Sequence, residues 1–264
     1  MTRLVDCLTG SGLSPGEARE ALAWGKVWYR GAPTALATRE VDPGAVEYRP
    51  EAPRHRVGRD PCVLLAGDGF VVVLKPPGML SVPAQGRRDP DVLRWAARRY
   101  GSSWVVHRLD EGTSGLLLVA LSETALLALK EDLHRHDVER RYLALVRGRF
   151  PDRLTSSGPI GDDPAVTHFV RLESLRQSSL VEARLETGRR HQVRIHLARE
   201  GHPVLGDTVY GPTGEGLAGK GRTRFALHAW RLGFRRPDTG EFAAVEAPLA
   251  DDLESLRRRM GGRP

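Results

Sequence analysis

Short apolar runs separated by turn residues recur along most of the chain, and they constrain its fold more than any other feature. Residues 63–75 contain the first two runs, which flank Gly-Asp-Gly and stop at Pro76 and Pro77, residues that cannot extend a central strand. Similar runs follow at residues 103–109, 114–121, 140–148, 167–175, 179–188, 225–234 and 241–248. Because many of them are neighbours joined by short turns, we expect a mixed, mainly antiparallel sheet.

Helices are predicted beside this sheet. One lies within residues 89–101, where Asp89 or Asp91 caps its start and Gly101 ends it. Others are expected at residues 122–136 and around residues 251–260. The predicted fold class is therefore α+β, with a sheet flanked by helices.

The first 55 residues are predicted to form a small separate α+β module. Ser14, Pro15 and Glu17 have the spacing of a helix start, and Gly25 ends that helix. Two short strands are expected after it, at residues 26–31 and 45–50. A proline- and arginine-rich linker then covers residues 49–61. We therefore expect a module over residues 1–55 and a main domain over residues 56–264.

The composition favours a polyanionic partner. The 264 residues include 40 lysines and arginines against 33 acidic residues, a formal net charge of +7. Arginine binds phosphate through a planar fork, although a basic surface also serves solubility. Cys7 and Cys62 are too few for a disulfide framework or a zinc site. No apolar run approaches the roughly 18 residues of a membrane helix, and the N-terminus lacks a signal-peptide pattern, so we expect a cytoplasmic protein without a membrane partner.

Residues 104–120, WVVHRLDEGTSGLLLVA, place Arg108 and Asp110 in a polar turn between two apolar runs. We expect a strand to end at these residues, with Thr113 and Ser114 bonding the turn and holding the aspartate. A carboxylate at the edge of an apolar sheet is a candidate nucleophile or base. The alternative is an ordinary turn with solvated charges.

Residues 185–211, LETGRRHQVRIHLAREGHPVLGDTVYG, form the second unusual segment. Gly201 favours a helix over residues 190–200, and in a helix or a strand Arg190 and Arg194 share a face. Arg194 near Asp110 would keep that carboxylate ionised and oriented. The alternative is an exposed arginine pair that covers the helix.

Two further features bear on the chemistry. His191, His196, His202 and Asp207 do not have zinc-ligand spacing, so no metal is expected. His107 is interpreted as a turn or phosphate contact. Tyr142 is either a core residue or a platform on which a base stacks, with Ala144 leaving room for it.

Four segments in order, LKPPGMLSVP, HRLDEGTSGLLL, RRYLALVRG and GRRHQVRIHLAREGHPVLGDTVYG, resemble the RluA-type pseudouridine synthases over roughly residues 63 to 250. The resemblance implies the pseudouridine synthase fold, isomerisation of uridines in ribosomal or transfer RNA, and no cofactor. It implies that Asp110 is the nucleophile and that Arg108 enters the RNA stack when the uridine is flipped out. It also implies that Arg194 pairs with Asp110, that Tyr142 contacts uracil and that Leu227 lies near the pocket floor.

The residues expected to contact RNA are Arg108, His107, Arg189, Arg190, His191 and Lys75, the last of these in the KP loop with Pro76. Many family members have threonine at the position that Arg190 occupies in this chain. The N-terminal module resembles a small RNA-binding domain with the alpha-L motif, but Glu17 and Glu20 lie where a basic helix is expected. We expect a monomer without a required protein partner. A noncatalytic RNA-binding or ribosome-assembly factor and a base-excising glycosylase are the alternatives.

Overall fold

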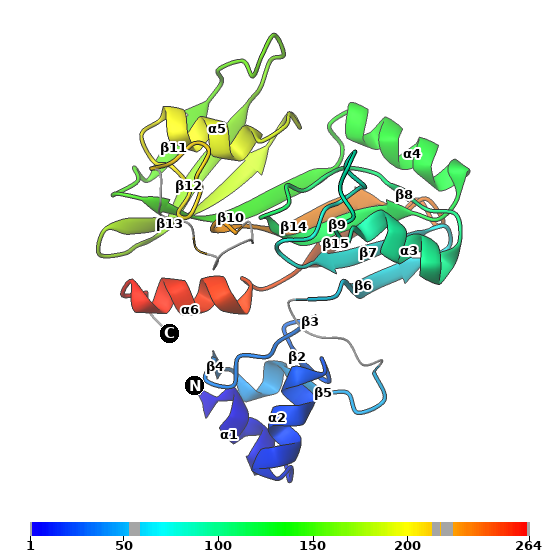
Figure 1. Cartoon of the computed structure of the whole chain (residues 1–264), viewed down its shortest axis with the longest axis vertical. Coiled ribbons are helices and arrows are strands. Elements are labelled where there is room, and N and C mark those ends of the chain that lie inside the picture. Colours follow the sequence, from blue (N-terminus) through cyan, green and yellow to red (C-terminus); the bar gives the residue numbers. More distant parts are fainter. Residues whose placement is uncertain (1, 53–58, 213–216, 218–223, 263–264) are drawn as a thin grey trace.

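The computed structural model describes residues 2–52, 59–212, 217 and 224–262, and its main feature is a ten-stranded sheet (Figure 1). The strand order is β11-β12-β13-β10-β14-β9-β7-β6, with β15 paired to β14 and β8 to β9. The strands are β6 (Cys62–Gly67), β7 (Phe70–Lys75), β8 (Trp104–Val105), β9 (Ser114–Ala120), β10 (Glu139–Arg147), β11 (Arg153–Ser156), β12 (Thr167–Ser174), β13 (Ser178–Leu185), β14 (Leu227–Arg235) and β15 (Phe242–Glu246).

Strand β14 joins two antiparallel blocks of this sheet. It runs antiparallel to β10 on one side and parallel to β9 on the other, where His228 lies opposite Ser114 and Ala229 opposite Gly115. The other described pairings in this sheet are antiparallel. The prediction of a mixed, mainly antiparallel sheet in an α+β fold is confirmed.

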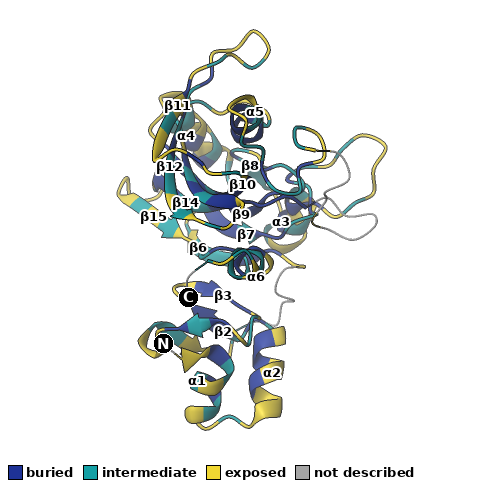
Figure 2. Ribbon diagram, turned by 90° about the vertical axis from the view of Figure 1, so that its left-hand side faces the viewer, coloured by how far each residue is buried: buried dark blue, intermediate teal, exposed yellow. Residues whose placement is uncertain are grey.

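Helices pack on both faces of the sheet because alternate strand residues point to opposite faces. Leu117 of β9 faces a core cluster that includes Val92 of helix α3, whereas Leu118 faces a second cluster that includes Leu129 of helix α4. Figure 2 shows the buried residues gathered in the central strands. The helices are α3 (Val92–Tyr100), α4 (Glu123–His134), α5 (Gln192–Arg199) and α6 (Asp251–Arg259). None of the helices in the described part of the chain is both long and apolar enough to cross a membrane.

The N-terminal residues form a separate layer with its own small core, below helix α6 in Figure 1. Its elements are β1 (Thr2–Arg3), α1 (Leu4–Gly10), α2 (Pro15–Ala23), β2 (Val27–Tyr29), β3 (Ala32–Pro33), β4 (Glu40–Val41), η1 (Pro43–Ala45) and β5 (Val46–Tyr48). The predicted capping box of α2 is present, with Ser14 and Glu17 exchanging hydrogen bonds. Helix α1 is not among the predicted elements, and residues 53–58 of the expected linker lie outside the described residues.

Helix α6 connects this layer to the sheet, and Figures 1 and 2 both show it between the two. The Asp251 carboxylate accepts hydrogen bonds from the Thr34 hydroxyl at 2.8 Å and from the Ala35 backbone N–H at 2.7 Å. The Arg39 guanidinium donates to the Leu249 carbonyl at 2.7 Å. The first turn of α6 is therefore tied to the N-terminal layer.

Gly115 is required at the junction of β9 and β14. Its φ of +120° is unfavourable for other residues, and a Cβ atom there would lie 2.2 Å from the Ala229 carbonyl oxygen. We expect Gly115→Ala to cost about 4 kcal/mol or more of unfolding free energy, from backbone strain and the clash together. Gly12→Ala is the control, because Gly12 has a φ of +103° with nothing within 4 Å of the added Cβ, and it should cost only about 1–3 kcal/mol. Equal losses in urea denaturation would contradict the clash.

Candidate active site

The loop that carries Asp110 is fixed by buried hydrogen bonds. The Ser81 hydroxyl accepts from the Leu109 N–H at 2.9 Å and donates to the Leu109 carbonyl at 2.7 Å, and the Thr113 N–H donates to the Asp110 carbonyl at 3.0 Å. The predicted strand is wrong in extent, since β8 ends at Val105. The Asp110 side chain retains 22% of its exposure, so its carboxylate is anchored yet accessible.

Arg194 contacts Asp110, as the sequence predicts. Its Nη1 atom donates to Asp110 Oδ2 at 3.1 Å, while its Nε and Nη2 atoms donate to the two oxygens of Asp207 at 2.6 and 2.9 Å. The Arg194 side chain is 5% exposed, and its guanidinium carbon lies 4.1 Å from the centre of the Phe225 ring. The predicted helix over residues 190–200 corresponds to α5, and it brings Arg194 under Asp110 from 84 residues away.

The carboxylates of Asp110 and Asp207 stabilise the charged form of Arg194. Burial alone would lower the pKa of Arg194, but hydrogen bonds and charge interactions with Asp207 and Asp110 raise it above its ordinary value. Burial alone would raise the pKa of Asp207, but its hydrogen bonds with Arg194 and with backbone N–H groups lower it. Asp207 is therefore an anion that holds the Arg194 guanidinium in place through two hydrogen bonds. Its sequence context, the Gly-Asp turn of the same motif, suggested only a metal ligand.

His191 lies on the other side of the Asp110 carboxylate. It precedes α5 with a left-handed φ of 58°, and its Nε2 atom is 3.6 Å from Asp110 Oδ1. Its Nδ1 atom is hydrogen-bonded to the Tyr210 hydroxyl at 3.0 Å. Burial and the nearby Arg194 lower the pKa of His191 despite the attraction of Asp110, which favours a neutral imidazole. Tyr210 is a site residue that the sequence reasoning missed.

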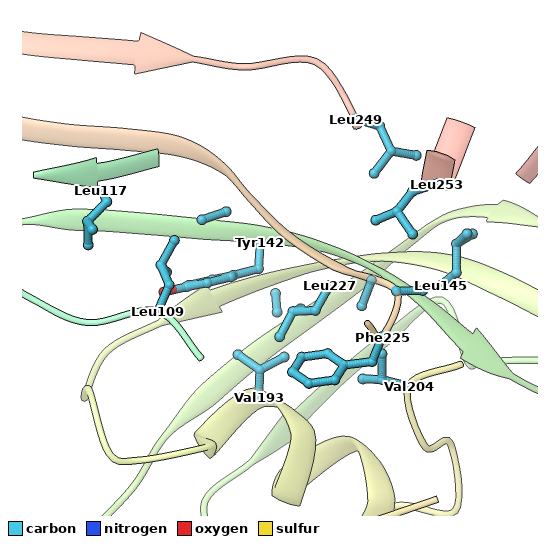
Figure 3. Packing of buried hydrophobic residues seen from close by; sticks show 14 of the residues in the cluster. Leu109, Leu117, Tyr142, Leu145, Val193, Val204, Phe225, Leu227, Leu249 and Leu253 are labelled. Atoms are coloured by element: carbon cyan, nitrogen blue, oxygen red, sulfur yellow. The ribbon is translucent and has the colours of Figure 1, made fainter. Parts of the chain in front are cut away.

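Apolar side chains form the walls of a small pocket beside Asp110. Tyr142 of β10 and Leu227 of β14 both line it and are 8% and 3% exposed. Figure 3 shows Tyr142 near Leu109 and Leu227, with Val193 approaching from helix α5. Burial raises the pKa of Tyr142 to about 12, so the phenol is neutral near pH 7. The pocket holds about 50 Å³, the space of a few water molecules.

Exposed arginines surround the mouth of this pocket. Arg108 and Arg189 are exposed and line it, and Arg189 Nε donates to the Pro164 carbonyl at 3.1 Å. Arg190 is exposed in the same loop. The positions of these side chains are compatible with the predicted RNA contacts.

Lys75 lies inside the protein, whereas the sequence predicts that it contacts RNA. Its side chain is fully buried, and its ammonium group donates to the carbonyls of Pro76, Met79 and Glu111 at 3.0, 2.7 and 3.3 Å. Burial and the nearby Arg224 lower the pKa of Lys75 to about 7. The predicted RNA contact is wrong for this residue, because its ammonium group holds loop carbonyls inside the protein.

His107 also points inward. Its Nε2 atom accepts a hydrogen bond from the Leu118 N–H at 3.3 Å. Burial, together with the nearby Arg140, lowers the pKa of His107 to about 3, so the ring is neutral. In the protein without RNA this imidazole is therefore uncharged at neutral pH, and its Nε2 atom is occupied by the Leu118 N–H.

The turn hydroxyls do not hold the aspartate as predicted. Ser114 Oγ accepts from Arg224 at 3.1 Å and is hydrogen-bonded to His228 Nδ1 at 2.8 Å, away from Asp110. Thr113 Oγ1 is buried without a hydrogen-bond partner among the described residues. The Asp110 loop is held instead by backbone groups and by Ser81.

The histidines considered for a metal are dispersed. His196 bonds the Thr167 hydroxyl and the Gly158 carbonyl at 3.0 and 2.9 Å, and His202 packs against the Phe150 ring. No group of three or more metal-ligating side chains is found within the described ranges.

Comparisons with known proteins agree with this fold. The solved structure of human RNA pseudouridylate synthase domain containing 1 is similar with a TM-score of 0.60 and 26% identity, covering 80% of this chain and 98% of the human one. The fold is thus that of the pseudouridine synthases. Residues 69–199 match the family model of RNA pseudouridylate synthase.

Bacterial proteins are similar to this chain in sequence over most of its length. A ribosomal large subunit pseudouridine synthase D of Nitrosomonas europaea is 34% identical over 76% of this chain. The alignment spans 66% of that relative's length. An RNA pseudouridine synthase of Mycobacterium bovis is 32% identical over 95% of this chain and 91% of its own length. The chain belongs to the RNA pseudouridylate synthase family.

Proposed function

We propose that this protein converts specific uridines of structured RNA, ribosomal or transfer, to pseudouridine, with Asp110 as the nucleophile. The observation that carries the proposal is the contact of Arg194 with Asp110 at 3.1 Å beside the pocket formed by Tyr142 and Leu227. A carboxylate needs such a partner to stay ionised next to apolar walls. Membership of the family supports RNA as the substrate.

The reaction is an isomerisation without redox chemistry. The bond from the ribose carbon to the uracil ring nitrogen breaks, the ring rotates, and a bond to a ring carbon forms while the proton of that carbon is lost and the nitrogen gains one. Attack of Asp110 on the ring and assistance at the sugar both require its ionised form. Arg194 places a positive charge 3.1 Å from the Asp110 carboxylate, and Asp207 holds that guanidinium in position.

The site must also hold a base that has left the helix. Unstacking costs a few kcal/mol, and we propose that phosphate contacts and insertion of Arg108 into the stack offset it. The pocket of about 50 Å³ is small for a whole pyrimidine, so the side chains of Arg108 and Arg189 at its mouth must move outward. Tyr142 then offers a neutral aromatic surface to the ring.

Incubation of the protein with total RNA tests the reaction. We expect a carbon-linked isomer of uridine at defined positions, with no change in RNA mass. Free uracil would instead indicate a glycosylase, and bound but unmodified RNA would favour the noncatalytic ribosome-assembly factor. The proposal includes a cytoplasmic monomer that needs no protein partner, and size-exclusion chromatography of the active protein checks its oligomeric state.

A further inference from the structure

Arg140 is a buried arginine next to the candidate site. It lies on β10 two residues before Tyr142, and its guanidinium reaches the loop before α5, beside Glu186 and Gly188. The residue is 7% exposed. Its one hydrogen bond to a described residue is a long one, from Nη2 to the Glu186 carbonyl at 3.5 Å, and its Nε atom is buried without a described partner.

No carboxylate among the described residues neutralises this guanidinium. The Glu186 carboxylate is directed away to His168 Nε2 at 2.6 Å, so only its main-chain oxygen faces Arg140. Burial lowers the pKa of Arg140 below its ordinary value. Arg194, by contrast, bonds two carboxylates in the same site. An unpaired buried charge reduces stability, so Arg140 is expected to have an anionic partner that arrives from outside.

Gly188 keeps the guanidinium within reach of such a partner. This glycine lies in the exposed loop before α5, and a Cβ atom on it would lie 2.3 Å from Arg140 Nη1. A side chain at residue 188 would therefore collide with the guanidinium in its present position. The exposed Arg189 and Arg190 follow directly, and together they make the approach over Gly188 strongly cationic.

We propose that Arg140 binds a phosphodiester group of the substrate RNA, which approaches over Gly188 and is held beside the Tyr142 pocket. The planar fork of a guanidinium matches the oxygens of a phosphate, and the unused donors of Nη1, the atom nearest to Gly188, supply the hydrogen bonds. Arg140 thereby positions the strand next to the flipped nucleotide. The inference rests on the proposed function in that RNA is the ligand.

A short fluorescein-labelled oligouridylate serves as the probe for Arg140→Met, Arg140→Lys and Arg184→Met. We expect Arg140→Met to weaken binding at least about tenfold and to reduce the slope of log affinity against log salt by about 0.7, as for one lost phosphate contact. Arg140→Lys should restore part of the affinity. Arg184 is the control, because it is exposed and faces the other side of the sheet, opposite Arg141.

Thermal unfolding separates binding from structure. Because Arg140 is an uncompensated buried charge, Arg140→Met should leave the melting temperature unchanged or raise it. A fall in melting temperature that accompanies the loss of binding would overturn the inference in favour of a structural role.

An oligouridylate with a neutral methylphosphonate backbone identifies the group that Arg140 contacts. The wild-type protein and Arg140→Met should bind it equally. A persisting deficit of the variant would show that Arg140 recognises the base, and failure of the wild type to bind the charged oligomer would also overturn the inference. If the wild-type protein forms no pseudouridine but Arg140→Met still binds the charged oligouridylate more weakly than the wild type, only the proposed reaction is refuted.

Discussion

Replacement of Asp110 by asparagine is expected to abolish pseudouridine formation, by at least about 10⁴-fold, while RNA affinity stays within a few fold. The amide preserves the shape of the side chain and its hydrogen bond from Arg194 Nη1, but it removes the anion. Single-turnover assays on modified RNA and equilibrium binding measure the two effects separately.

Glu111→Gln is the matched control for Asp110→Asn. Glu111 is the next residue in the same loop, and its carboxylate pairs with Arg87 at 2.8 Å, away from Arg194. Loss of this neighbouring charge should leave the rate nearly unchanged. Substantial residual activity of Asp110→Asn would contradict the nucleophile assignment.

The second large effect is expected for Arg194→Ala, which should lose activity together with about 3–5 kcal/mol of unfolding free energy. Removal of the guanidinium leaves Asp110 and the buried Asp207 facing each other without a cation. Guanidinium chloride denaturation and the RNA assay measure the two losses.

Arg184→Ala controls for the loss of a positive charge, because Arg184 is exposed on β13 and is not among the residues expected to contact RNA. The pH dependence is a second check. Although burial opposes it, hydrogen bonding to Arg194 lowers the pKa of Asp207, so this stabilisation is present at neutral pH and is lost as the pH falls through the lowered value. The stability difference between wild type and Arg194→Ala should therefore shrink in acid. Unchanged activity of Arg194→Ala would show that its contact with Asp110 has no role in the reaction.

Local signals in the sequence predicted much of the fold. Asp91 caps α3 and Gly101 ends it with a φ of 80°, as expected. Such signals depend on a few adjacent residues, so they can be read without the tertiary structure. Helix α1 has a non-polar start without a side-chain cap at Arg3, and it was missed for that reason. Strand β8 is shorter than its apolar run because residues beyond Val105 turn toward Asp110.

The sequence predicted those site residues whose type has one usual chemical role, such as an arginine that pairs with a carboxylate. An arginine near Asp110 follows from the need to stabilise a carboxylate, and Arg194 has that contact. The roles of Asp207 and Lys75 depend on residues that are close only in the folded chain. Lys75 was expected to contact RNA because its segment resembles the KP loop of the family, yet its ammonium group turns inward to three carbonyls.

The central place of β14 has a consequence for folding. The strand that bridges the two halves of the sheet begins at Leu227, more than a hundred residues after the Ser114 that it adjoins. Within the described sheet, β14 is the strand that pairs with both β9, which follows the Asp110 loop, and β10, which carries Tyr142. Non-local pairing of this kind is slow. The contact of Arg194 with Asp110 is therefore expected to form late in folding, after β14 has paired with both β10 and β9.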